Sequence, residues 1–228
     1  MFSSEDQLVE TFAAHVADFL ESRGVGRHRY EVDLGGRVAD IVATRFPNPS
    51  PPGQLLRKLR QIPAVELFYV AHLLSRPLKT TTLAERTWSS VERVAEVVHR
   101  MERRNILSRT KSGKAFTVKG WKEFLPVETV AFEAKLDDWR EAIEQATTYA
   151  RRADRAWVVM PERHRQNEDL RSACKKRGIG LVVVSRDSIA KVVRPRSRQG
   201  QITSLREMRL RLLWDLARNE DERWVEHC

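Results

Sequence analysis

The chain has 228 residues, of which 41% are hydrophobic, so it can bury the core of one large domain or of two small ones. No apolar run approaches the ~20 residues of a membrane-spanning helix, and no signal segment opens the chain, so we expect a cytoplasmic protein. Two cysteines are too few for a disulfide framework or a zinc cluster. The net charge of +10 favours a polyanionic partner, with nucleic acid first. A solvated basic surface is the alternative.

Residues 5–23 have the pattern of an amphipathic helix. Its apolar positions recur every four residues, at Leu8, Phe12, Val16 and Leu20. Gly24 and Gly26 would end it. Glu5 and Glu10 are candidate acidic residues on this helix, and a solvated helix carboxylate is the ordinary alternative for either.

Two strands are predicted next, over residues 29–34 and 37–43, with Gly35-Gly36 as a hairpin turn between them. Asp40 lies inside the second strand, among apolar residues. An unpaired carboxylate there would be costly. Asp40 is therefore expected either to bond to backbone amides or to bind a metal ion.

The sequence changes character at residues 46–53, where four prolines and a glycine predict a linker. Beyond it, a helix is expected over 64–74, a short helix over 82–87 and a longer one over 91–104. Residues 108–118 follow as two strands around a basic turn.

This order of elements, over roughly residues 55–122, resembles a winged helix-turn-helix. In that fold the second helix of the pair enters the DNA major groove, and the hairpin reaches phosphates. The resemblance implies these DNA-binding residues: Ser89, Ser90, Arg93, Arg100, Arg109, Lys111 and Lys114. The alternative is a winged helix that packs only against protein.

Residues 127–136 predict an apolar strand that ends in charge. Side chains alternate along a strand, so Glu133 and Lys135 share one face. A metal site would explain this pair, and a surface ion pair is the plainer reading. A helix over 137–150 follows, with Gln145 on or near its apolar stripe.

The remaining pattern alternates strand, helix and strand. A strand is expected over 155–160, a helix over 166–177 and a strand over 180–185, which implies parallel pairing. The tail, from about Arg186, is predicted as a basic loop over 194–200 and then a helix from Ser204 to Trp214 or Arg218.

Without the inserted segment, these elements resemble the PD-(D/E)xK nucleases, in their restriction-endonuclease-like and Holliday-junction-resolvase-like branches. The resemblance implies an α/β fold with an αβββαβ core and a mixed sheet. Asp40 and Glu133-Ala134-Lys135 match the family's motif, although Ala39 stands where the motif has proline. It implies Asp40, Glu133 and the Ala134 carbonyl as Mg²⁺ or Mn²⁺ ligands, with Lys135 beside the attacking water. Gln145 and Glu5 would support the site, and Glu10 is the less favoured acid.

The domain organisation expected from this resemblance has five parts. They are a first core segment (1–46), a linker (47–54), the winged-helix insertion (55–125), a second core segment (126–190) and a basic loop with a helix (191–228). The expected function is cleavage of DNA, most simply double-stranded, by a homodimer in genome defence or DNA repair. Two alternatives stay open: a non-catalytic DNA-binding protein that uses the fold as a scaffold, and a nuclease subunit of a larger defence or repair complex.

Overall fold

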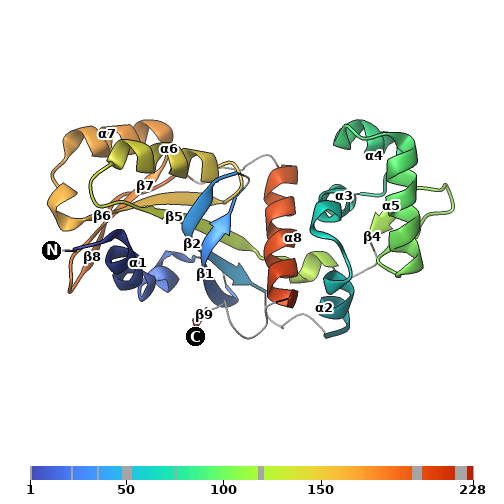
Figure 1. Ribbon diagram of the computed structural model, residues 1–228, viewed down its shortest axis with the longest axis horizontal. Coiled ribbons are helices and arrows are strands. Elements are labelled where there is room, and N and C mark those ends of the chain that lie inside the picture. Colours follow the sequence, from blue (N-terminus) through green and yellow to red (C-terminus); the bar gives the residue numbers. More distant parts are fainter. Residues whose placement is uncertain are drawn as a thin grey trace. The chain divides into compact units, whose positions relative to one another are not determined.

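The computed structural model divides into two compact units, shown together in Figure 1. Unit 1 comprises residues 1–48, 127–205 and 221–228, and unit 2 comprises residues 49–126 and 206–220. The structure describes residues 2–21, 23–34, 36–47, 53–74, 76–117, 121–196, 202–218 and 225–227. The fold is mixed α/β.

Unit 1 is built on a seven-stranded mixed sheet with the order β8-β7-β6-β5-β2-β1-β9 among the described residues. The neighbouring strands β5, β6 and β7 run parallel, and the pairs β1–β2, β2–β5, β7–β8 and β1–β9 are antiparallel. Its strands are β1 (Val25–Asp33), β2 (Val38–Phe46), β5 (Glu128–Ala134), β6 (Arg155–Pro161), β7 (Gly180–Val184), β8 (Ile189–Val193) and β9 (Val225–His227).

Helices cover both faces of this sheet, with α1 on one side and α6 and α7 on the other (Figure 1). The helical segments are α1 (Glu5–Ala13), η1 (Val16–Phe19), α6 (Trp139–Tyr149), η4 (Glu162–His164) and α7 (Glu168–Arg177). On the α1 side, Phe12, Phe19 and Phe132 pack ring against ring, with centroids 4.9–5.3 Å apart. Tilted and edge-to-face aromatic pairs of this kind add to the burial term, so α1 is fixed against β5.

Unit 2 is mostly helical and carries a short hairpin. Its elements are α2 (Gly53–Arg60), η2 (Ala64–Glu66), α3 (Leu67–Leu73), α4 (Thr80–Thr87), α5 (Val91–Arg103), β3 (Leu107–Arg109), β4 (Ala115–Thr117), η3 (Trp121–Phe124) and most of α8 (Ile202–Arg218). Val94, Val97, Val98 and Met101 bury one side of α5. The Trp214 indole donates to the Ile62 carbonyl (2.9 Å), which joins α8 to the segment before α3.

Four sequence expectations need correction. The predicted helix over 5–23 ends at Ala13, and a 3₁₀ turn over Val16–Phe19 replaces its second half. The turn keeps the four-residue apolar pattern buried while bringing Phe19 onto β5. Gly53 and Gln54, expected in the linker, begin α2, and residues 48–52 of that linker lie outside the described residues.

The other two corrections concern the chain after residue 186. Ile189–Val193 forms β8, although the sequence analysis treats this stretch as the start of the tail. The segment 191–228 is not one part, because residues 206–220 belong to unit 2 and β9 pairs with β1 in unit 1. Of the predicted basic loop, residues 197–200 lie outside the described residues.

Among the helices that the structure describes, none has both the length and the apolar composition required to cross a lipid bilayer.

A buried ion pair holds the start of β5 in place. The Arg155 guanidinium pairs with the Glu128 carboxylate and also donates to the Phe19 carbonyl (2.7 Å). Glu128 in turn accepts the backbone N–H of Glu21, at 2.9 and 3.1 Å to its two oxygens. The segment after η1 is thereby tied to the strand that carries Glu133.

Replacing Arg155 by Ala should lower the free energy of unfolding of unit 1 by about 3–5 kcal/mol, since it leaves the Glu128 carboxylate buried without its cation. Urea unfolding followed by circular dichroism measures this change. Arg151→Ala, which removes an exposed arginine of the same unit, serves as the control and should stay within about 0.5 kcal/mol of wild type. Equal stabilities for the two variants would contradict the prediction.

Candidate functional site

Two acidic residues meet at one end of the β2–β5 pair. The ladder pairs Ile41 with Phe132, and the next pair in the same register is Asp40 with Glu133. Residues directly opposite each other share a face of the sheet. Ile41 and Phe132 point toward α1, whereas Glu133 is contacted from α6 on the opposite face, by the Tyr149 hydroxyl. The Asp40 Oδ2 atom accepts the Ala134 backbone N–H at 2.7 Å, which fixes this carboxylate beside β5.

Glu133 is 2% exposed and is held from α6. The Tyr149 hydroxyl lies 2.8 Å from Glu133 Oε2, 2.7 Å from the Val38 carbonyl and 3.1 Å from Gln145 Oε1. Gln145 Nε2 donates to Glu141 Oε1 at 2.9 Å. Residues 141, 145 and 149 are spaced by four, so they line one face of the helix, and this row of polar side chains positions the Glu133 carboxylate.

Lys135 joins this pair to α1. Its Nζ lies 3.2 Å from Glu5 Oε2 and 4.0 Å from Glu133 Oε1. The second Glu5 oxygen accepts the backbone N–H of Leu136 at 3.4 Å. The structure therefore brings Glu5, and not Glu10, to Lys135. Glu10 lies on α1 one to two turns away and lines a neighbouring pocket.

The charges at this site are strongly coupled. Burial raises the pKa of Glu133 to about 8, and the negative charge of Asp40 acts in the same direction. Burial also raises the pKa of Asp40, although the Ala134 amide and Lys135 partly offset this effect. Burial alone would lower the pKa of Lys135, but its hydrogen bond to Glu5 and the nearby carboxylates outweigh it and raise the pKa. Lys135 therefore stays protonated between the carboxylates of Glu5 and Glu133.

The capacity of Asp40 and Glu133 to bind a metal ion depends on the carboxylate oxygens that make no hydrogen bond. Among the described residues, no three or more His, Cys, Asp or Glu side chains are arranged to hold a metal. Asp40 and Glu133 each use one carboxylate oxygen in a hydrogen bond, to Ala134 and Tyr149. Their second oxygens make no hydrogen bond within the described part of the chain.

Two carboxylates suit Mg²⁺, which keeps several waters and completes its shell with substrate phosphates, better than they suit a protein-enclosed ion. A divalent cation would also relieve the repulsion that raises the pKa of Glu133. The donor set therefore fits a partly hydrated Mg²⁺ or Mn²⁺. Ligation through the Ala134 carbonyl stays a prediction.

A pocket of about 360 Å³ opens beside Asp40, and its lining shows two acids that the sequence analysis did not single out. It is lined by Asp6, Val9, Glu10, Tyr30, Glu31 and Asp40. Glu31 has a positive φ of 52° between the β1–β2 pairs Tyr30–Ile41 and Val32–Ala39, so it sits opposite Asp40. Such a conformation costs a non-glycine residue about 1–3 kcal/mol and is often found at functional sites. A two-residue turn at Gly35-Gly36, as expected from the sequence, implies this position of Glu31 opposite Asp40.

Tyr149 is a further residue of the site that was not expected from the sequence. Its spacing of four from Gln145 was the available signal.

The predicted DNA-binding residues of unit 2 fall into two groups. Arg93, Lys111 and Lys114 are exposed, and Arg93 has only a loose pair with Glu96 (3.8 Å). The others have internal partners: Ser89 bonds to Tyr69 and Thr87, Ser90 accepts the Arg93 backbone N–H at the start of α5, Arg100 pairs with buried Glu66, and Arg109 pairs with Glu102 and donates to the Gly113 carbonyl. These contacts support the fold of unit 2.

Trp88 is a feature of unit 2 that residue spacing did not reveal. It lies in the turn between α4 and α5, has φ 51° and is 97% exposed. A fully exposed indole next to the start of α5 is an available contact for a partner molecule.

No family model, no curated protein and no solved structure matches this chain.

Glu133→Gln should change how stability depends on pH when EDTA removes divalent cations. With a native pKa of about 8, Glu133 keeps a proton that the unfolded chain loses near its ordinary value. Wild-type stability should therefore fall as the pH rises from about 4.5 to 8. Above pH 8 the Gln variant should be more stable than wild type by a few kcal/mol, since a change of one in a pKa corresponds to about 1.4 kcal/mol.

Urea unfolding at pH 5, 7 and 9 measures this difference, and Glu144→Gln, an exposed glutamate on the same helix as Tyr149, is the control. Mg²⁺ at about 100 times its Kd should restore about 2.7 kcal/mol to wild type at high pH and less to Glu133→Gln. Parallel pH profiles for wild type and Glu133→Gln would show that Glu133 does not titrate in this range.

Proposed function

We propose that this protein is a metal-dependent DNA endonuclease of the PD-(D/E)xK type. The observation that carries the proposal is the meeting of Asp40, Glu133 and Lys135 at one end of the β2–β5 pair, with Glu5 on Lys135. These residues come from three elements that are up to 130 positions apart in sequence. An acid pair with a lysine is the set that phosphodiester hydrolysis requires.

The order of elements in unit 1 supports the same reading. It runs α1, β1, β2, β5, α6, β6, which is the αβββαβ order expected of a restriction-endonuclease-like core. In unit 1, Asp40 occupies the second strand of that order and Glu133 the third. The helix that follows, α6, supplies Gln145 and Tyr149.

Each residue has a distinct part in the proposed reaction. A bound Mg²⁺ or Mn²⁺ would supply an acidified water and would polarise the phosphate. Asp40 and Glu133 would hold this ion through their free oxygens. Lys135 would orient the attacking water or offset the negative charge that develops on the phosphate.

Three further residues act through those above and are positioning residues. Tyr149 and Gln145 fix the Glu133 carboxylate, and Glu5 holds the Lys135 ammonium. In this arrangement the lysine stays protonated and cannot serve as the base, since its pKa is raised.

Unit 2 supports the DNA part of the proposal. Its two helices α4 and α5 are followed by the β3–β4 hairpin, the order of a winged helix-turn-helix. Lys111 and Lys114 lie in the turn of that hairpin and Arg93 on the first turn of α5, all exposed. We propose that these cations bind DNA phosphates and that Trp88 contacts the same duplex. Cleavage of both strands would then be simplest for a homodimer.

A second candidate function is a non-catalytic DNA-binding protein, alone or within a larger defence or repair complex. The observation that favours it is the lack of a cluster of three metal-binding side chains in the described residues. The two candidates differ in one result, because only the nuclease cuts DNA when Mg²⁺ or Mn²⁺ is added.

Purified protein should cleave plasmid or linear duplex DNA in Mg²⁺ or Mn²⁺, and EDTA should stop it. Asp40→Asn, Glu133→Gln and Lys135→Ala should each slow cleavage by at least about 100-fold while DNA binding is retained. Glu144→Gln should cut at the wild-type rate. Binding without cleavage by the wild-type protein, in either metal, would favour the second candidate.

Replacing Lys111 and Lys114 together by Gln should weaken DNA binding at every sequence tested. It should also reduce the slope of log Kd against log salt by about 1 for each lost phosphate contact. Fluorescence anisotropy over a salt series measures both quantities. Lys175→Gln combined with Lys176→Gln, which replaces two exposed lysines on α7, is the charge-matched control. If the hairpin variant keeps the wild-type salt slope, the hairpin does not contact DNA phosphates.

A further inference from the structure

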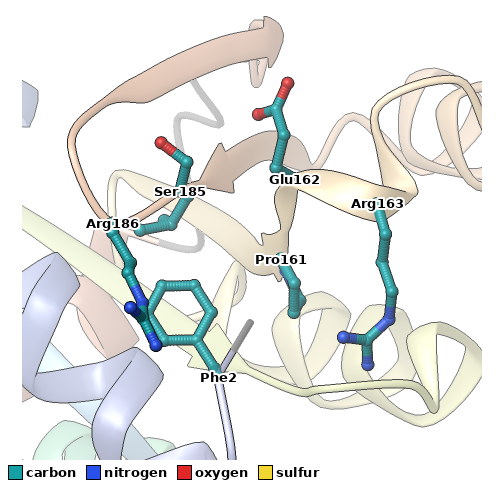
Figure 2. A pocket seen from close by; sticks show the side chains of 7 residues that line it. Phe2, Pro161, Glu162, Arg163, Ser185 and Arg186 are labelled. Carbon is teal, nitrogen blue, oxygen red and sulfur yellow. The ribbon is translucent and has the colours of Figure 1, made fainter.

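A second pocket, of about 260 Å³, lies at the ends of β6 and β7 in unit 1 (Figure 2). Its lining consists of Phe2, Pro161, Glu162, Arg163, Val184, Ser185 and Arg186. Pro161 is the last residue of β6 and Val184 the last of β7. The carboxyl ends of parallel strands are a common place for ligands in open α/β sheets.

This pocket lies at the edge of the sheet to which the proposed active site also belongs. The strands β5, β6 and β7 are parallel, so Lys135, which follows β5, belongs to the same edge of the sheet. Arg163 donates to the carbonyl of Leu136 at 2.9 Å, and His164 Nε2 lies 2.9 Å from the same oxygen. From the other side, Phe2 precedes Glu5 by three residues. A molecule bound to Lys135 could therefore continue into this pocket.

The chemistry of the lining is apolar in the middle and cationic at two sides. The Phe2 ring and Pro161 lie between the Arg186 and Arg163 side chains in Figure 2. Arg163 uses one nitrogen on Asp137 (2.7 Å), and the Glu162 charge is offset by Arg165 (2.7 Å). Arg186 is exposed and has no ion-pair partner among the described residues. The pocket thus retains cationic groups for an anionic ligand.

Size limits what this ligand can be. Pockets for whole drug-sized ligands measure about 300–1,000 Å³. A pocket of about 260 Å³ suits one planar ring better than a complete dinucleotide or cofactor. A single nucleobase in the apolar middle of the pocket, with its backbone phosphates near Arg186 and Arg163, matches both the size and the charge.

We propose that this pocket binds one unstacked nucleobase of the DNA strand being cut, beside the scissile phosphate, with Arg186 and Arg163 on the flanking phosphates. This inference rests on the proposed nuclease function and narrows its substrate. A base inside a continuous duplex cannot enter the pocket without leaving its stack. The preferred substrate is therefore DNA with a single-stranded end, flap or junction, not a blunt uninterrupted duplex.

The first test measures nucleotide binding directly and requires no cleavage. Thymidine 5′-monophosphate is titrated into the full-length ¹⁵N-labelled protein, with inorganic phosphate and thymidine in parallel. The nucleotide should shift amide signals of residues 162–163 and 184–186, and Arg186→Gln should weaken its binding at least fivefold. Lys176→Gln should leave it unchanged. Shifts of equal affinity with phosphate alone would reduce the pocket to an anion site and overturn the inference, as would no shift at those residues.

The second test compares flap DNA with blunt duplex DNA of the same sequence. Wild type should bind and cut the flap substrate at least tenfold better, as measured by kcat/KM. Arg186→Gln and Phe2→Ala should lose most of this preference, chiefly through KM. Thermal unfolding checks that Phe2→Ala is folded, and Arg186→Gln, an exposed change, tests the pocket without that concern. An unchanged preference in Arg186→Gln would contradict the inference.

The two proposals fail in different ways. Cleavage that is intact and indifferent to Arg186→Gln, with no nucleotide bound, overturns only the base pocket. Nucleotide binding at residues 162–163 and 184–186 without any cleavage of DNA overturns the nuclease, and with it the placement beside a scissile phosphate, and leaves the pocket as a nucleotide-binding site.

Discussion

The site depends on one cross-strand meeting, that of Asp40 with Glu133. The antiparallel register of β2 and β5 puts these acids opposite each other, and the Ala134 amide and the Tyr149 hydroxyl then hold one oxygen of each. Burial raises the pKa of Glu133 to about 8, and the negative charge of Asp40 on the neighbouring strand acts in the same direction. Hydrophobic packing does not require such a pair. A nearby cation, or protonation of one carboxylate, would reduce the repulsion between the two.

Lys135 supplies one positive charge beside these carboxylates and connects them to α1. Its ammonium lies between Glu133 and Glu5, at 4.0 and 3.2 Å, and so links the strand to the first turn of α1. The ring contact of Phe12 with Phe132 holds the same helix against β5, and Phe19 of η1 packs on Phe132 beside it. Apolar packing thus sets the position of α1, and the ion pair uses that position. A helix displaced by one turn would bring Glu5 away from the lysine.

The sequence predicts the elements of this site well because each depends on local pattern. Alternation along residues 127–136 places Glu133 and Lys135, and the glycine turn sets the register that aligns β1 with β2. The preference for Glu5 over Glu10 comes from the family resemblance. Local pattern does not predict the break of α1 at Ala13 or the pairing of Arg100 with Glu66. Each is decided by a contact between segments far apart in the chain. Two arginines of α5 illustrate this. They look alike in the sequence, but Arg93 is exposed whereas Arg100 pairs with the buried Glu66.

The strained backbone at Glu31 extends this argument from the acids to the shape of the site. A positive φ in the middle of β1 removes one pair from the ladder opposite Asp40 and helps to open a pocket of about 360 Å³ there. If only a structural hydrogen bond from Asp40 were required, a regular ladder would satisfy the backbone at lower cost. Beside the irregular pair, the pocket is lined by the acids Asp6, Glu10, Glu31 and Asp40. The strain at Glu31 and the raised pKa of Glu133 are two costs that meet at Asp40, which lies opposite both residues and whose charge adds to the raised pKa. In the proposed nuclease, a bound cation would offset the second of these costs.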